Sequence, residues 1–174
     1  MRASGRRRRV AEFGRLGREL LSDPIAFLSA EHVRQGALLG HLERLARHPD
    51  GRGSRALAQA LAEWLAVDLP RHFADEEASL HARLQPFDEG GLLRRLCAGH
   101  AARVAEMPPL IAALRAIAAH EPPGPDFPAR ALRFAAAIRA RLALEEAELA
   151  PLARRVLAPE ALAEITAELA ARRE

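Results

Sequence analysis

Five side chains in this sequence are of the types that bind transition metals, and two of them are spaced to face one ion. His72 and Glu76 are four residues apart, so on a helix they differ by only about 40° and lie one turn apart. Imidazole and carboxylate together suit iron or zinc, whereas magnesium and calcium sites are built from oxygen ligands and need no histidine. One such pair is a weak signal by itself. The other three candidates are His32, His100 and Glu145.

The five candidates lie at matching distances from three predicted turns of the chain. Helix-breaking residues mark these turns, near Gly51, Asp88 and Pro123. His32 lies 19 residues before the first turn and His72 lies 21 after it. Glu76 and His100 each lie 12 residues from the second turn. His100 lies 23 residues before the third turn and Glu145 lies 22 after it. At about 1.5 Å of rise per residue, a mismatch of two residues amounts to about 3 Å. In antiparallel helices the five side chains would therefore share one layer, as in metal sites built between the helices of a bundle.

The hydrophobic pattern predicts four long helices and a short closing helix, with no strands. The first helix begins at Pro24, after the capping residue Asp23, and ends before Pro49. The others cover about 54–84, 89–119 and 126–156, and the closing helix follows Pro159. Prolines should disturb three of these helices, because proline removes a backbone hydrogen bond and clashes with the preceding turn. They are Pro70, the adjacent Pro108 and Pro109, and Pro151.

The predicted fold is all-α: an antiparallel up-and-down four-helix bundle over residues 19–157, with a short closing helix at 158–174. Residues 1–18 hold seven arginines and one glutamate, whereas the rest of the chain holds 19 arginines and 22 acidic residues. A basic tail of this kind could contact nucleic acid or an anionic membrane. It has no interleaved aromatic residues and no groove-reading fold follows it, so we expect a disordered, solubilising tail and no nucleic-acid binding.

Several function classes lack their sequence signals. There is no uncharged run long enough to span a membrane, and no apolar segment of a secretory signal follows the arginines. The single Cys97 cannot form an internal disulfide, so we expect a cytoplasmic protein. Neither a serine-histidine-aspartate order nor a phosphate-binding glycine loop occurs, so no residue argues for catalysis. The oligomeric state is not specified by the sequence.

Four stretches of the chain resemble the hemerythrin-like, His-His-Glu cation-binding domains of bacteria. They are SAEHVRQGALLGHL, LPRHFADEEASL, LCAGHAARVAEM and ARLALEEAELAPLA, which lie within residues 22–157. In that family, two irons bridged by oxo or carboxylate groups bind O2, NO or peroxide, and other members sense iron or repair iron centres. The resemblance implies a metal site made of His32, His72, Glu76, His100 and Glu145.

The fourth stretch departs from the family pattern at one ligand position. Where the family has a histidine four residues before the glutamate, this chain has Arg141. The resemblance implies that His72 and His100 serve one iron, and that His32 and the missing histidine serve the other. A guanidinium cannot act as a ligand, and one turn before Glu145 it can pair with that carboxylate and repel a metal. We therefore expect iron at reduced stoichiometry, such as one iron in place of two.

No other histidine of the chain is placed to restore the lost ligand. His41 follows His32 by nine residues, and His81 follows His72 by the same interval, which puts each on about the opposite helix face.

The sequence thus predicts non-haem iron binding in a bundle core, with binding or sensing of O2, NO, peroxide or iron itself. A metal-free, degenerate bundle acting as a structural or interaction module is the alternative. A ferritin-like carboxylate oxidase fits less well, because that class places glutamate before histidine at a spacing of three. Here the histidine comes first, at a spacing of four.

Overall fold

The computed structural model describes residues 16–174, and every regular element within this range is a helix or a helical turn. The all-α prediction is confirmed. The predicted disordered tail falls mostly on residues 1–15, outside the described range. The elements are η1 (Arg18–Ser22), α2 (Pro24–Arg47), α3 (Ser54–Glu63), η2 (Trp64–Asp68), α4 (Leu69–Ala74), η3 (Asp75–His81), α5 (Ala82–Leu84), η4 (Gln85–Phe87), α6 (Leu92–Cys97), α7 (His100–Ala118), α8 (Phe127–Leu144), η5 (Glu145–Leu149), α9 (Ala150–Val156) and α10 (Pro159–Ala171).

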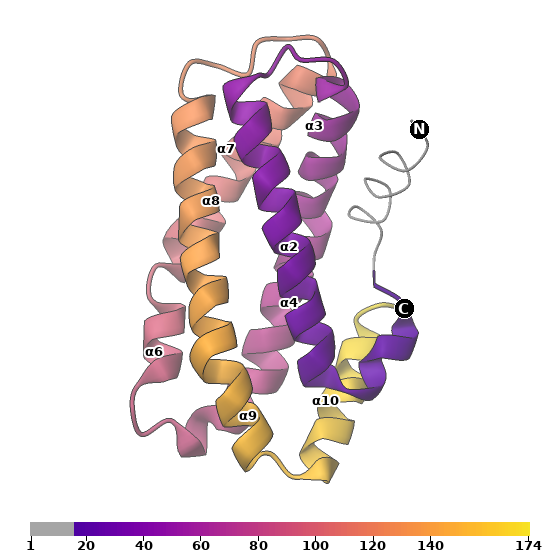
Figure 1. Ribbon diagram of the computed structural model, residues 1–174, viewed down its shortest axis with the longest axis vertical. Coiled ribbons are helices and arrows are strands. Elements are labelled where there is room, and N and C mark those ends of the chain that lie inside the picture. The colour runs from indigo at the N-terminus through magenta and orange to yellow at the C-terminus, as the bar shows by residue number, and fades with distance from the viewer. Residues whose placement is uncertain (1–15) are drawn as a thin grey trace, which may run out of the picture.

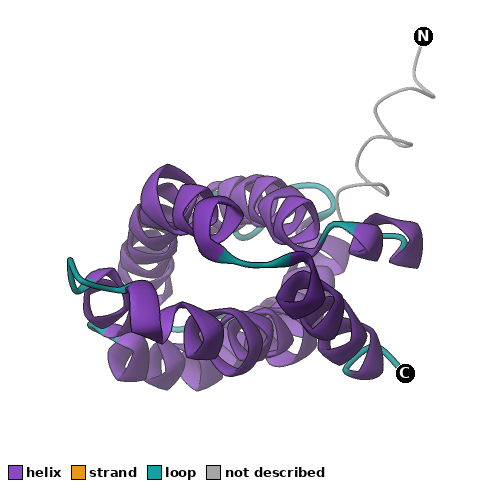
Figure 2. Ribbon diagram, turned by 90° about the horizontal axis from the view of Figure 1, so that it is seen from below, coloured by secondary structure: helices purple, strands orange, loops and turns teal. Residues whose placement is uncertain are grey.

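The long helical segments lie side by side around a common centre (Figures 1 and 2). α2 packs against α8 and α3, and α7 packs against α3 and α8. The loops at 48–53 and 119–126 lie at one end of the molecule, where residues of both line one pocket. α10 lies near the opposite end and packs on η1, η3 and α2. None of the described helices is long and apolar enough to cross a membrane.

The buried apolar residues form two clusters with a polar layer between them. One cluster contains Leu38 of α2, Phe73 of α4 and Ile138 of α8. The other contains Leu28, Leu80 and residues of α9 and α10. Along α2 the buried His32 lies between Leu28 and Leu38, so it stands where the two clusters meet. The candidate ligands are therefore held between two packed apolar blocks, at about the middle of the bundle.

Two of the predicted proline disturbances appear as π-helical turns, in which the backbone bonds span five residues. The N–H of Leu69, just before Pro70, donates to the carbonyl of Trp64, and the N–H of Ala150, just before Pro151, donates to that of Glu145. Proline has no N–H, and its ring clashes with the carbonyl four residues earlier. The wider turn moves that carbonyl aside. The helices are thus widened before these prolines and continue beyond them.

Pro108 and Pro109, expected to bend or break the third helix, do not break it. α7 runs through both prolines from His100 to Ala118, and the buried Met107 and Leu110 on either side of the pair pack in the core and hold the helix together. The third segment is instead interrupted at residues 98–99. Gly99 has φ 72°, a conformation that glycine adopts without strain.

Candidate metal centre

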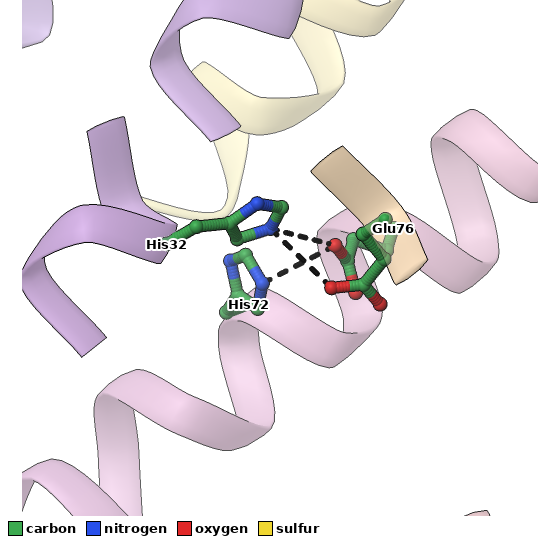
Figure 3. Close-up of side chains that lie close together, drawn as sticks. His32, His72 and Glu76 are labelled. Carbon is green, nitrogen blue, oxygen red and sulfur yellow. Dashed lines mark hydrogen bonds and ion pairs between the residues drawn. The ribbon is translucent and has the colours of Figure 1, made fainter. Parts of the chain in front are cut away.

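Four of the five predicted ligands converge in the polar layer. They are His32, His72, Glu76 and Glu145, and all four are buried. One ligand atom from each lies within 4.8 Å of the ligand atoms of the other three. They come from α2, α4, η3 and η5, so three separate stretches of the chain build the group. Figure 3 shows the rings of His32 and His72 turned toward Glu76.

The ring nitrogens and carboxylate oxygens of the group lie close to one another. His32 Nε2 is 3.1 Å from Glu76 Oε1 and 3.5 Å from Glu145 Oε2. His72 Nε2 is 3.3 Å from the same Glu76 oxygen, and the two imidazole rings meet edge to face at 5.0 Å between centroids. Two ring nitrogens and two carboxylate oxygens thus point to one place.

The group fits a cation because some of its buried polar atoms make no hydrogen bond. Within the described residues, neither ring nitrogen of His72 has a hydrogen-bond partner, and neither does Glu145 Oε2. Buried polar atoms left without partners are costly, and each needs an explanation. Two imidazoles with carboxylates form a donor set that suits iron(II) and related divalent metals. A cation held by the group would satisfy His72 Nε2 and Glu145 Oε2 together.

Both glutamates of the group stand in π-helical turns, η3 for Glu76 and η5 for Glu145. Such turns are rare, and they occur frequently at functional sites because the extra residue re-aims neighbouring side chains. The sequence did not reveal the turn at η3. For η5 the only signal was Pro151, which follows two residues after the turn ends.

Arg141 binds both carboxylates of the group from the side. Its Nη2 donates to Glu76 Oε2 at 2.6 Å, and its Nε donates to Glu145 Oε1 at 2.5 Å. The side chain is 3% exposed, and its guanidinium lies over the Phe73 ring at 4.7 Å. Burial alone would lower the pKa of Arg141, but the two carboxylates outweigh burial and raise it. A permanent positive charge is thus built into the layer.

His100 is not brought into the group. Its Nδ1 lies 3.0 Å from Glu77 Oε1 and 3.5 Å from Arg141 Nη1, and its side chain is 29% exposed. The Arg141 guanidinium is bonded to the Glu76 carboxylate and faces His100. It therefore occupies the space through which the His100 ring would have to reach the other candidate ligands. Counting residues from the predicted turns placed His100 in the same layer of the bundle as the other candidates. This counting took no account of the volume of the Arg141 side chain.

Glu146 is a member of the site that the sequence analysis missed. Its Oε1 lies 2.5 Å from His32 Nδ1, and its Oε2 accepts a hydrogen bond from Ser29 Oγ at 3.2 Å. A carboxylate on the far nitrogen of a ligating imidazole fixes the ring and leaves Nε2 for the metal. The adjacent pair Glu145–Glu146 was visible in the sequence, but only the structure shows that the two side chains reach opposite nitrogens of one ring.

The close packing of charges shifts the pKa values of the group in different directions. Burial would lower the pKa of His32, but the hydrogen bond and charge of Glu76, with the charge of Glu145, raise it to about 9. Burial opposes ionisation of Glu76, yet His72 and His32 hold its pKa well below the usual range. Burial and the charge of Glu76 raise the pKa of Glu145 to about 7. His32 and Arg141 therefore supply the positive charge that balances the carboxylates.

The two histidines that spacing placed on other faces, His41 and His81, do not belong to the group of four. Both are buried, and burial lowers the pKa of His81. Neither adds a ring nitrogen to the four candidate ligands.

Comparison with known proteins agrees with this geometry. The family model of the hemerythrin HHE cation-binding domain matches residues 23–153, a range that contains all four members of the group and Arg141. No curated protein and no solved structure matches the chain. Since the family model covers well over half of its residues, this chain belongs to the hemerythrin HHE cation-binding domain family.

Proposed function

We propose that the chain binds one iron ion in the core of its bundle. His32, His72, Glu76 and Glu145 would hold it, and the observation that carries the proposal is their convergence within 4.8 Å with buried ligand atoms unpartnered. The scaffold in this proposal is an up-and-down bundle of alternating helix directions. The two loops that share a pocket at one end support that course.

One ion rather than two is proposed because Arg141 takes the place of a second cation. Its guanidinium contacts one oxygen of Glu76 and one of Glu145, which leaves the other oxygen of each facing the histidines. The positive charge of Arg141 also repels a metal on its own side of the carboxylates. Glu76 and Glu145 would thus bridge a metal and a guanidinium, and His100 would stay outside the coordination.

A very small ligand is the proposed partner of the bound iron. A cavity of about 10 Å³ adjoins His32, Glu76 and Glu145, and its other walls are Ser29 and apolar side chains. Those side chains include Ile25, Leu28, Leu80 and Leu149. This volume is about the minimum for one water molecule, so a diatomic ligand such as O2 or NO would enter only with a small outward movement of the apolar walls, and larger ligands would be excluded. Iron would supply a coordination position for the ligand, and the role would be reversible binding or sensing of O2, NO, peroxide or iron itself.

A metal-free bundle is the second candidate, and a specific observation favours it. A protonated His32 and Arg141 together carry two positive charges, which match the two carboxylates of the layer without any metal. In this reading the layer is a purely structural ion network, and the protein acts as a structural or interaction module.

Iron loading distinguishes the two candidates. Protein incubated anaerobically with Fe²⁺ and then desalted should retain about one iron per chain, and His72→Ala should lose most of it because a buried ligand is removed. His48→Ala is the matched control, since His48 is exposed and lies in the loop after α2. Parent protein that retains no iron, or His72→Ala that retains as much as the parent, would favour the metal-free reading.

A further inference from the structure

The end of α10 is bonded directly to the π-turn that carries Glu76. Asp75, the residue before Glu76, is fully buried, and its two oxygens accept hydrogen bonds from two consecutive arginines. Arg172 Nη1 donates to Asp75 Oδ1 at 3.1 Å, and Arg173 Nη2 donates to Oδ2 at 2.5 Å. Arg172 Nη2 also donates to Ser79 Oγ at 2.9 Å. Two fully buried side chains of η3 are thus held by the two arginines that follow α10.

Asp75 and Glu76 face different parts of the molecule from one stretch of backbone. Asp75 is bonded to the arginines after α10, whereas Glu76 points into the bundle toward His32. Consecutive helical residues diverge by about 100°, so a rotation of the turn that moves one side chain moves the other. A π-turn is an unfavourable helical geometry, and tertiary contacts must hold it. The arginines supply such contacts on a different face of the turn from the one that carries the candidate ligand.

Loss of the arginines would leave a buried carboxylate without a partner. An uncompensated buried charge is strongly unfavourable, so the turn would rotate or open until Asp75 reached water. That movement would carry Glu76 away from the place where its oxygen now lies 3.1 Å from His32 Nε2 and 3.3 Å from His72 Nε2.

The apolar face of α10 supports the same region. Ile165 and Leu169 are fully buried in the cluster that contains Leu80 and Leu149, two walls of the small cavity beside the site. The Arg173 guanidinium also lies over the Phe27 ring at 4.6 Å. α10 and the arginines after it therefore contact the elements that carry the candidate ligands through both apolar and ionic contacts. It lies beyond residue 153, where the family match ends.

We propose that Arg172 and Arg173 are positioning residues for the metal site. By pairing with Asp75 they hold η3 in the rotation that aims Glu76 at the cation, so docking of α10 sets cation affinity. The inference rests on the proposed function, since it concerns the affinity of that same site.

The experiment titrates the full chain with Co²⁺, whose visible absorption reports coordination by imidazole and carboxylate. The double variant Arg172→Gln/Arg173→Gln should bind Co²⁺ about 10- to 100-fold more weakly than the parent, the usual effect of removing a group that orients a ligand. In an Asp75→Asn background the same two changes should have little further effect, because the charge they neutralise is gone. The lysine double variant should recover part of the affinity.

Arg83→Gln is the matched control. Arg83 also joins this region to α10: it donates to Glu164 and Glu168 at 3.0 and 2.7 Å and to the Ser79 carbonyl of η3 at 2.9 Å. It makes none of the bonds to Asp75, so it separates general docking of α10 from the pairing with Asp75. It should lower the melting temperature without changing the Co²⁺ affinity more than about twofold. A double variant that loses stability but keeps the parent's affinity would overturn the inference.

A failure of the proposed function itself gives a different result. Parent protein that binds no Co²⁺ refutes the metal site, and hydrogen exchange then tests the positioning on its own. Amides of residues 75–81 should exchange faster in the double variant than in Arg83→Gln, and equal exchange would refute the positioning role.

Discussion

Replacing Arg141 by histidine should have two effects. It should lower the stability of the metal-free protein, and it should raise the number of iron ions bound per chain from one to two. Arg141 is buried and donates to two buried carboxylates, at 2.6 and 2.5 Å. Removing one partner of a buried ionic group costs about 3–5 kcal/mol, because the remaining charge is left uncompensated. For a chain of this size each kcal/mol lowers the melting temperature by about 2–4 °C, so the metal-free variant should melt about 6–20 °C below the parent.

Iron should reverse much of that loss. An imidazole at position 141 lies one turn before Glu145 and can share a cation with both carboxylates, where the guanidinium could not. At a free Fe²⁺ concentration of about 100 times its dissociation constant, a second bound ion restores about 2.7 kcal/mol. Calorimetry with and without Fe²⁺, together with iron analysis, measures both effects. The iron content should rise from about one toward about two per chain.

Arg139→His is the control for this comparison. Arg139 lies on the same helix, its side chain is 43% exposed, and it pairs with Glu43 at the surface. The control should change stability by less than about 1 kcal/mol and leave the iron content unchanged. The reasoning would be refuted if metal-free Arg141→His were as stable as the parent, or if the parent already bound two irons.

Three further predictions concern the charges of the layer. Glu146→Gln should weaken iron binding by about tenfold, because the charged partner of His32 Nδ1 that orients the ring is lost. The melting temperature should change little, since Glu146 is exposed. An unchanged iron affinity would show that Glu146 is not part of the site. In the metal-free protein the contribution of His32 to stability should be complete below pH 6.5, and about 3 kcal/mol should be lost as pH rises through about 9, since the pKa of His32 is raised from 6.5 to about 9 by Glu76 and Glu145. Denaturant titrations at several pH values measure this loss, and His32→Ala should flatten the profile. Chelation of iron-loaded protein should lower its melting temperature, while His72→Ala should respond to chelator much less.

The all-α fold and four residues of the candidate metal centre could be predicted from periodicity and spacing. A helix rises by a fixed distance per residue, so offsets from the turns placed His32, His72, Glu76 and Glu145 at one depth, and the structure brings these four together. The sequence also showed that Arg141 could pair with Glu145, and its bond to that carboxylate is present in the structure. These features depend on helix geometry, which a single sequence specifies well.

Features that depend on side-chain volume and on contacts between distant segments could not be read this way. His100 stands at the expected depth, but the bulk and charge of Arg141 separate it from the carboxylates. The π-turn at η3 has no residue pattern of its own. The pairing of Asp75 with Arg172 joins residues almost a hundred positions apart, and no local periodicity marks it.

The division of the interior into two apolar clusters bears on how this protein unfolds. One cluster joins α2, α3, α7 and α8, whereas the other joins η1 to α10, the two ends of the described chain. A layer of charges between them offers little apolar contact across the middle, so the cluster containing both ends can open while the other stays folded. An ion bound by side chains from α2, η3 and η5 would bridge that boundary and make the two halves unfold as one cooperative unit.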